Sequence, residues 1–224
     1  MTDLRLVIFD VDGTLVDSQA EIVGAMAEAF AAEGLPAPDR TAILSIVGLS
    51  LPEGFRALCP DADDVLRDRL AGHYRAAFRD HATADLTRRS PLFPGALDAI
   101  RRLHAQPHTL LAVATGKSRR GLDRLIDQHD LHGLFVSRQT ADTHPSKPHP
   151  SMVRACLADA GVPAGRAAMV GDTTYDMDMA RAAGVATLGV AWGYHAPEAL
   201  RADRIITTFA DLDAAIETLT GEDA

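Results

Sequence analysis

Short apolar runs, each followed by a segment of helical periodicity, dominate this sequence of 224 residues. The two clearest runs cover residues 4–9 and 109–115, and the second reads TLLAVAT. A strand that is apolar throughout, without polar alternation, is buried on both faces, which is typical of a parallel sheet covered by helices. The repeated order of run and helix therefore predicts an α/β fold with a doubly wound parallel sheet.

Shorter strands are expected in the second half of the chain, at residues 134–137, 167–170, 185–190 and 204–206. Apolar residues three or four positions apart indicate helices at residues 94–106, 118–130, 150–161, 175–184 and 210–219. Sheets of this kind bind ligands beyond the carboxyl ends of their strands. Functional residues are therefore expected directly after the apolar runs.

The segment between the first strand and residue 92 differs from the rest, because no strand is expected there. Helical periodicity begins near Ser18 and ends before Gly34. Three further helices are expected at residues 39–47, 52–58 and 61–80. Ser18 and Glu21 have the spacing of a capping box, so we expect the Ser18 side chain to cap the first helix.

This helical block is expected to form a domain of its own. With 47% hydrophobic residues, the chain can bury one sizeable core and a smaller satellite core. Tyr74 and Phe78 belong to an apolar stripe of the last helix and are interpreted as core packing. We expect an α/β core of residues 1–17 and 91–224, and an all-helical domain of residues 18–90 inserted after the first strand.

The composition narrows the classes of partner. The formal net charge is -9, which argues against a surface that attracts nucleic acid or anionic lipid. No apolar run approaches the ~18 residues that a membrane span needs, and no signal peptide is recognised. Cys59 and Cys156 lack the spacing of a zinc site. We expect a cytoplasmic protein, monomeric or homodimeric, without nucleic-acid or membrane partners.

The residues that follow the apolar runs carry carboxylates. The first run ends in Asp10 and Asp12, and the run at residues 167–170 is followed by Asp172 and Asp176. Carboxylates gathered at one sheet edge repel one another and lose solvation, which costs free energy. A hard divalent cation removes that cost, and Mg²⁺ is the expected cofactor because it prefers carboxylates and works with phosphate.

A hydroxyl and a lysine complete this set. Thr115 and Gly116 end the run TLLAVAT, and Lys147 lies just ahead of an expected helix. A hydroxyl beside backbone N–H groups at a helix N-terminus suits an anion, and a lysine binds phosphate oxygens. The set predicts a phosphoryl group held between a metal and Lys147, which a carboxylate can attack to form an aspartyl phosphate.

These residues resemble the four motifs of the haloacid dehalogenase-like hydrolases. The matching elements are DVDGT at residues 10–14, Thr115, Lys147 and GDTTYD at residues 171–176. The stretches VATGKSRRGLDR, SKPHP and MVGDTTYDMDMARAAGV look closest to the phosphoglycolate phosphatase-like branch. The helical block resembles the cap domain that this family inserts after the first strand.

The resemblance implies a role for each motif residue. Asp10 would be the nucleophile, and Asp12 would be the general acid and base. Thr115 and Gly116 would bind the phosphate, and Lys147 would bind it too and stabilise the developing negative charge. The dehalogenases of the family lack the second aspartate, so Asp12 favours a phosphatase.

The metal ligands implied by the resemblance are Asp10, Asp12 through its backbone carbonyl, and Asp172, with Asp176 in support. The expected activity is Mg²⁺-dependent hydrolysis of a small phosphomonoester, such as a phosphoglycolate-like compound or a sugar phosphate. A phosphomutase of the same architecture is the alternative, followed by a non-catalytic phospho-acceptor module of a signalling pathway. The expected partner is a small phosphorylated metabolite.

Candidate substrate contacts lie outside the four motifs. Gly48 and Ser50 form a loop between helices of the cap, and such a loop faces the substrate in similar proteins. Arg56, Arg119 and Arg120 are candidates for binding a substrate carboxylate. The shape of the cap pocket, which sets the substrate, is not encoded in any of the four motifs.

Overall fold

A six-stranded parallel sheet forms the centre of the protein in a computed structural model that describes residues 4–84 and 90–221. The strand order is β3-β2-β1-β4-β5-β6. The strands are β1 (Arg5–Phe9), β2 (Thr109–Thr115), β3 (Ser137–Thr140), β4 (Ala167–Gly171), β5 (Ala186–Val190) and β6 (Arg204–Ile206). Every neighbouring pair is parallel, so the predicted α/β fold is confirmed.

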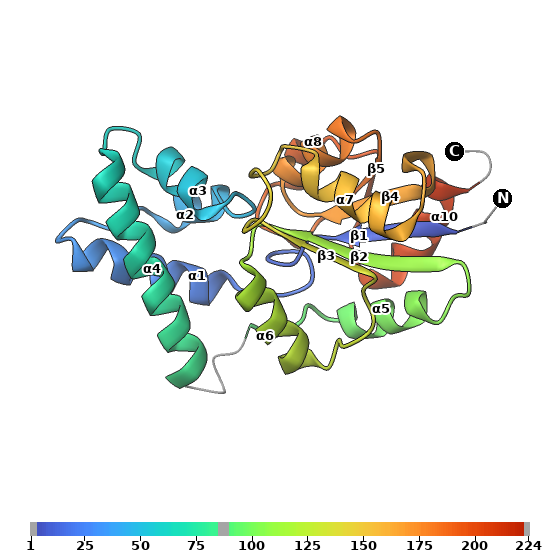
Figure 1. Ribbon diagram of the computed structural model, residues 1–224, viewed down its shortest axis with the longest axis horizontal. Helices are drawn as coiled ribbons and strands as arrows, with labels where there is room; N and C mark the ends of the chain where they lie inside the picture. Colours follow the sequence, from blue (N-terminus) through green and yellow to red (C-terminus); the bar gives the residue numbers. More distant parts are fainter. Residues whose placement is uncertain (1–3, 85–89, 222–224) are drawn as a thin grey trace.

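Helices cover both faces of the sheet, as Figure 1 shows. One face carries α5 (Ala96–His104), α6 (Arg119–His129) and α10 (Leu212–Thr220). The other carries α7 (Ser151–Ala160) and α8 (Thr174–Ala182). Shorter helical turns are η2 (Ala164–Arg166), α9 (Pro197–Leu200) and η3 (Phe209–Asp211).

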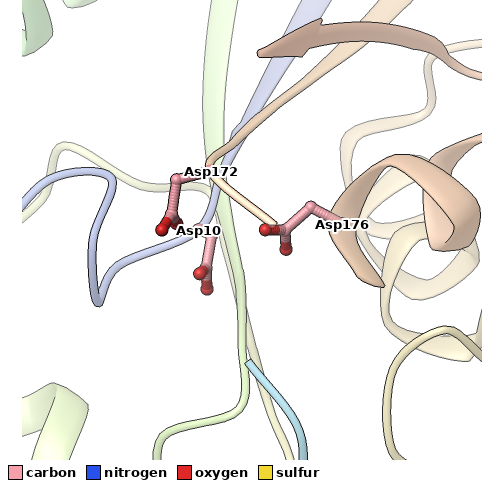
Figure 2. A group of neighbouring side chains, drawn as sticks. All are labelled: Asp10, Asp172 and Asp176. Carbon is pink, nitrogen blue, oxygen red and sulfur yellow. The ribbon is translucent and has the colours of Figure 1, made fainter. Parts of the chain in front are cut away.

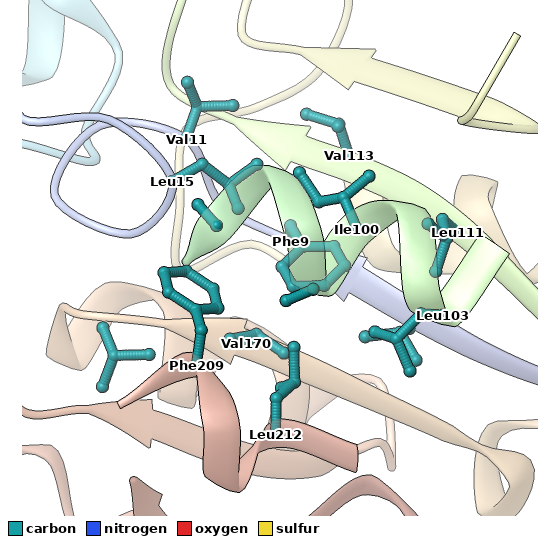
Figure 3. Packing of buried hydrophobic residues seen from close by; sticks show 14 of the residues in the cluster. Phe9, Val11, Leu15, Ile100, Leu103, Leu111, Val113, Val170, Phe209 and Leu212 are labelled. Atoms are coloured by element: carbon teal, nitrogen blue, oxygen red, sulfur yellow. The ribbon is translucent and has the colours of Figure 1, made fainter. Parts of the chain in front are cut away.

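The central strand β1 explains why the apolar runs show no alternation. Val7 and Phe9 pack into the cluster beneath α5 and α10, where Figure 3 shows Phe9 among side chains of these helices. Leu6 and Ile8 pack into the cluster on the opposite face. Each fully buried side chain of this size contributes ~1.5–3 kcal/mol through burial. After Arg5, at the start of β1, both faces of the strand are therefore apolar, and the carboxylate of Asp10 follows its other end.

One strand prediction was wrong. Residues 134–137 were expected to form a strand, but the strand is Ser137–Thr140, paired with the end of β2. Leu134 and Phe135 are apolar because they pack from a loop against the cluster beneath α5 and α6, and Val136 is exposed. The apolar run therefore marks the approach to the strand, while the strand itself is mostly polar.

Between β1 and α5, the described residues form four helices, which we call the helical insertion and which lie at the left of Figure 1. They are α1 (Gln19–Ala32), α2 (Arg40–Ser45), α3 (Leu51–Leu58) and α4 (Asp64–Ala84). The insertion has its own hydrophobic cluster, which contains Phe30, Phe55 and Leu70. This cluster is separate from those of the sheet, as expected for an inserted unit.

The expected division at residues 1–17, 18–90 and 91–224 stays a prediction, and parts of it (residues 1–3, 85–89 and 222–224) lie outside the described residues. Among the helices that the structure describes, none combines the length and apolar character needed to cross a membrane.

Candidate active site

Three carboxylates meet at the carboxyl end of the sheet. Asp10 follows β1, Asp172 follows the neighbouring strand β4, and Asp176 lies in the first turn of α8. Figure 2 shows their side chains converging. One carboxylate oxygen from each lies within 4.8 Å of the other two, and all three residues are buried. The strand order produces this cluster, because it places residues 162 positions apart on adjacent strands.

Lys147 lies between two of these carboxylates. Its Nζ is 2.7 Å from Oδ1 of Asp10 and 2.6 Å from Oδ1 of Asp176, and its side chain has no exposed surface. Burial by itself lowers the pKa of Lys147, but Asp10 and Asp176 outweigh that effect and raise it above its usual value. The lysine is therefore positively charged and offsets part of the negative charge of the cluster.

The negative charge of the cluster is not fully compensated by the protein. Burial, together with Asp176 and Asp12, raises the pKa of Asp10 to about 7, even though Lys147 lowers it. Burial, together with Asp176 and Asp10, raises the pKa of Asp172 well above its usual range. Within the described chain, Oδ2 of Asp10 has no hydrogen-bond partner. Buried acceptors of this kind need a donor or a cation.

The cluster fits a hard divalent cation. Mg²⁺ prefers carboxylate oxygens at ~2.0–2.1 Å and retains water ligands, so three inward carboxylates with an unpartnered oxygen suit it. Asp10 and Asp172, both predicted as ligands, lie in the cluster. Asp176, which was predicted to support the metal, also contributes a carboxylate oxygen to the cluster. The side chain of Asp12 points elsewhere, which leaves its backbone carbonyl as the group expected to bind the metal.

The carboxylates of the cluster are held in place by neighbouring groups. The Thr14 hydroxyl donates to Oδ1 of Asp172 at 2.9 Å, and the backbone N–H of Tyr194 donates to Oδ2 at 2.8 Å. The hydroxyl and backbone N–H of Thr173 donate to Oδ2 of Asp176 at 2.7 and 3.0 Å. These bonds fix the two carboxylates before any ligand arrives.

A close approach of the chain to Asp172 requires glycine at position 13. Gly13 turns the chain out of β1 with φ +85°, and a Cβ there would lie 2.2 Å from Oδ2 of Asp172. The sequence motif DVDGT therefore has a packing reason for its glycine as well as a conformational one.

Asp12 has a different environment from the cluster. Its Oδ1 accepts a hydrogen bond from Oγ of Ser18 at 2.6 Å and faces Nζ of Lys117 at 2.9 Å. Tyr194 supports Ser18, because its hydroxyl accepts from the Ser18 backbone N–H at 3.0 Å. The predicted capping role of the Ser18 side chain was wrong: Ser18 is the N-cap residue of α1, but its hydroxyl bonds Asp12 instead of the helix backbone.

The predicted phosphate-binding residues lie at the end of β2. Thr115 is buried, and its hydroxyl accepts from the backbone N–H of Lys117 at 3.2 Å. Gly116 touches the insertion, since a Cβ there would lie 2.6 Å from the carbonyl oxygen of Gly48. Ser50 also reaches the core, where its backbone N–H donates to Oγ of Ser146 at 2.8 Å. The Gly48–Ser50 loop therefore covers the strand ends.

A cavity of about 440 Å³ opens between the strand ends and the helical insertion. Asp10, Asp12, Thr115 and Gly116 line it from the sheet side, and the insertion lines it with Gly48, Ser50 and the two aromatic residues Tyr74 and Phe78. The aromatic pair was expected only as core packing. The two rings do stack at 5.7 Å, but they also form part of the cavity wall.

Of the three arginines predicted as substrate contacts, one lines the cavity and two lie outside it. Arg120 lines the cavity. Arg56 does not, and it pairs with Glu53 on the exposed side of α3. Arg119 is also outside the lining, and it donates to the backbone carbonyl of Arg138.

Two site residues escaped the sequence analysis. Lys117 contacts Asp12. It directly follows the Thr115–Gly116 motif and is one of two lysines in the chain, so its place at a strand end could have predicted it as a site residue. Tyr194 follows the end of β5, and reasoning from strand ends applies to it as well. Its two contacts, to Ser18 and to Asp172, could not be predicted because they depend on how the loop after β5 folds back.

Buried carboxylates that could hold a cation lie beside a charged lysine, which suits the chemistry of phosphoryl groups. Proteins of similar sequence place the chain among the phosphoric monoester hydrolases. More narrowly, a family model described as haloacid dehalogenase-like hydrolase matches residues 7–190, so the chain belongs to that family. The predicted resemblance, including the phosphoglycolate phosphatase-like branch, is confirmed.

Individual relatives agree with this assignment. "Probable phosphatase IndB" of Dickeya dadantii is 37% identical over 220 residues, covering 96% of this chain and 94% of that protein. A phosphoglycolate phosphatase of Mesorhizobium japonicum is 31% identical, covering 84% of this chain and 83% of that protein. A haloacid dehalogenase-like hydrolase of Streptococcus pneumoniae has a structure with TM-score 0.81 and 25% identity, covering 96% and 99% of the two chains.

Proposed function

We propose that the protein is a Mg²⁺-dependent phosphatase that hydrolyses a small phosphomonoester through an aspartyl phosphate on Asp10. The observation that carries this proposal is the buried Asp10, with one oxygen facing Lys147 at 2.7 Å and the other without a hydrogen-bond partner among the described residues. A carboxylate oxygen that is desolvated and free on one side is suited to attack a phosphorus atom.

In the first half of the reaction, Asp10 attacks the phosphoryl group and Lys147 stabilises its charge. Oδ2 of Asp10 forms a bond to phosphorus as the bond to the ester oxygen breaks. Lys147 stabilises the negative charge of the phosphoryl oxygens, and Thr115 with the backbone at Gly116 holds them. A Mg²⁺ ion bound by Asp10, Asp172, Asp176 and the backbone of Asp12 would neutralise the carboxylates and polarise the phosphoryl group.

Asp12 moves the protons. Ser18 and Lys117 both contact its Oδ1, so Oδ2 remains available for proton transfer. In the first step Asp12 gives a proton to the departing ester oxygen. In the second it takes a proton from the water that attacks phosphorus, and the bond between phosphorus and Asp10 breaks to release phosphate. The fixed position of Oδ1 supports the assignment, because a proton-transfer group needs one defined orientation.

The helical insertion acts as a cap in this proposal. Its Gly48–Ser50 loop touches Gly116 and Ser146, and its α4 forms one wall of the cavity. A substrate bound there would be enclosed between the insertion and the sheet, away from bulk water. Enclosure of this kind strengthens the electrostatic interactions of the site and excludes competing water.

Phosphate release from p-nitrophenyl phosphate tests the proposal. The protein should release phosphate with Mg²⁺, lose activity with EDTA, and regain it when Mg²⁺ is restored. Asp10→Asn should lower kcat by more than about 10³-fold, because an amide is a poor nucleophile. Asp178→Asn is the matched control, since Asp178 is exposed on α8 and pairs with Arg181 at the surface. Turnover without metal, or an Asp10→Asn variant that keeps most activity, would refute the mechanism.

Product analysis separates the two alternatives. With a sugar phosphate as substrate, a phosphatase releases inorganic phosphate, whereas a phosphomutase returns a positional isomer. A non-catalytic phospho-acceptor would accumulate a stable phosphoprotein without turnover. Asp10→Asn should abolish any phosphoprotein that forms, which mass spectrometry of acid-quenched protein can measure.

A further inference from the structure

Lys117 is one of two lysines in the chain, and the proposed reaction gives it no step of its own. It follows the end of β2 and lies just ahead of α6. Only 11% of its side chain is exposed, and its Nζ lies 2.9 Å from Oδ1 of Asp12. A lysine is rarely buried to this extent unless a partner compensates its charge, so the contact with Asp12 indicates a specific role.

The chain makes room for the stem of this lysine at Gly121, in the first turn of α6. A Cβ at position 121 would lie 2.8 Å from Cγ of Lys117 and 3.2 Å from Cδ. Glycine is unfavourable inside a helix, and Gly121 is not among the glycines with positive φ that would require it. The close approach therefore accounts for the glycine, because it lets the lysine stem pass α6 on its way to Asp12.

The helical insertion also contacts the ammonium group of Lys117. Nζ lies 5.1 Å from the centroid of the Phe78 ring, which belongs to α4 and lines the cavity. The face of an aromatic ring attracts a cation, most strongly where water is partly excluded. Lys117 is thus held between the core and the insertion, with its charge directed at Asp12.

The carboxylate of Asp12 needs such contacts to keep one orientation. The torsion that rotates an aspartate carboxylate has a broad energy profile, so neighbouring groups must fix it. Oγ of Ser18 donates to Oδ1 of Asp12 at 2.6 Å, and Nζ of Lys117 contacts the same oxygen at 2.9 Å. A single donor would let the carboxylate pivot about that contact, whereas two donors from different segments restrict its rotation.

Resting on the proposed function, in which Asp12 moves the protons, we propose that Lys117 is a positioning residue for that carboxylate. Its ammonium group holds Oδ1, so that Oδ2 keeps one orientation for giving a proton to the ester oxygen and later taking one from water. In this role Lys117 forms no bond to the substrate and exchanges no proton with it. Because a displacement of about 1 Å can cost ~10²-fold in rate, loss of this contact should be measurable.

Two esters of similar shape separate the positioning of Asp12 from the binding of phosphate. Benzyl phosphate releases a strongly basic alkoxide that needs a proton from Asp12, whereas p-nitrophenyl phosphate releases a weakly basic phenolate that needs little help. Lys117→Met removes the ammonium group and keeps an unbranched side chain. It should lower kcat/KM for benzyl phosphate at least about tenfold more than kcat/KM for p-nitrophenyl phosphate. An equal loss for both esters would overturn the proposal, because it would place Lys117 on the phosphoryl group that both share.

Gly121→Ala tests the same contact without removing the charge. The added Cβ would meet the Lys117 stem, while alanine favours the helix, so circular dichroism should show the fold retained. The selective loss for benzyl phosphate should appear again, by at least about threefold. Gly72→Ala on α4 is the matched control, because a Cβ there has no atom of the described residues within 4 Å. Unchanged selectivity in Gly121→Ala, or an equal change in Gly72→Ala, would overturn the assignment.

Asp12→Asn distinguishes failure of this inference from failure of the proposed function. It should also lower kcat/KM more for benzyl phosphate than for p-nitrophenyl phosphate. If Asp12→Asn affects both esters equally, the proton-transfer role of Asp12 fails, and the role of Lys117 fails with it. If Asp12→Asn discriminates between the esters and Lys117→Met does not, the proposed function stands and the positioning role of Lys117 fails.

Discussion

Lys147 is the residue on which the charge balance of the site depends. It is the cation between Asp10 and Asp176, at 2.7 and 2.6 Å, and it is fully buried. Sequence reasoning predicted its place beside the carboxylates from a single lysine ahead of a helix. It could not predict the contact with Asp176, because that contact depends on how α7 and α8 pack beside each other on one face of the sheet.

Lys147→Met should therefore destabilise the metal-free protein by about 3–5 kcal/mol, since removing one partner leaves buried carboxylates without compensation. Urea unfolding in EDTA measures the change. Asp178→Asn breaks an exposed pair and should cost at most about 1 kcal/mol. A loss for Lys147→Met no larger than that of the surface control would contradict the buried charge balance.

A second prediction at the scale of single residues concerns the need for glycine at position 13. Gly13→Ala adds a Cβ that would meet Oδ2 of Asp172 at 2.2 Å, whereas Gly34→Ala adds one to open space at a similar positive φ of +67°. Both variants carry backbone strain of ~1–3 kcal/mol, and only the first displaces a proposed metal ligand.

Gly13→Ala should accordingly lower kcat/KM at least about tenfold and raise the Mg²⁺ concentration needed for half-maximal activity, while Gly34→Ala should lower stability alone. Thermal unfolding and Mg²⁺ titration of the activity separate the two effects. Equal behaviour of the two variants would show that strain, and not the approach to Asp172, determines the need for glycine at position 13.

At the scale of elements, the sequence predicted the strands whose both faces are buried and failed where a strand is polar. The run TLLAVAT coincides with β2, but β3 has the sequence SRQT and lies at the edge of the sheet, so its residues carry no apolar signal. The approach of the strand ends to one another was predictable from the parallel order. The loops that add Tyr194 and Lys117 to the site were not, because short loops have no periodicity.

The junction between the insertion and the core gives a prediction for one element, α2. The Tyr175 hydroxyl on α8 donates to the backbone carbonyl of Ser45 at 3.1 Å, and its ring packs edge-on against His195 at 5.5 Å. Tyr175→Phe removes the hydrogen bond and keeps the ring. Because this bond is exposed, stability should change by less than about 1 kcal/mol.

The effect of Tyr175→Phe should appear in the insertion instead. Amide hydrogen exchange at residues 40–50 should become faster, and KM should rise about two- to fivefold because the insertion is less well ordered over the cavity. Tyr74→Phe is unsuitable as a control because Tyr74 lines the cavity, so Thr218→Val on α10, far from the junction, serves instead. Unchanged exchange at residues 40–50 would contradict a tethering role for Tyr175.

At the scale of the whole molecule, the cluster of Asp10, Asp172 and Asp176 links stability to both pH and cation. Burial and neighbouring carboxylates raise the pKa of Asp10 to about 7 from 3.8, and the pKa of Asp172 is also raised. At pH values between 3.8 and about 7, the metal-free folded protein therefore binds more protons than the unfolded chain. Stability of the metal-free protein should therefore fall as the pH rises from about 4 to about 7.

A divalent cation should reverse this trend, because it binds the ionised carboxylates and competes with their protons. The increase in Tm caused by 5 mM Mg²⁺, a concentration on the order of typical assays, should thus be larger at pH 8 than at pH 5.5. Thermal unfolding at both pH values, with Mg²⁺ or EDTA, measures it. Asp10→Asn removes one ionising ligand and should flatten the pH dependence of the metal-free Tm, whereas Asp178→Asn should leave it as it is. Equal Mg²⁺ shifts at both pH values would contradict a cluster that exchanges protons for a cation.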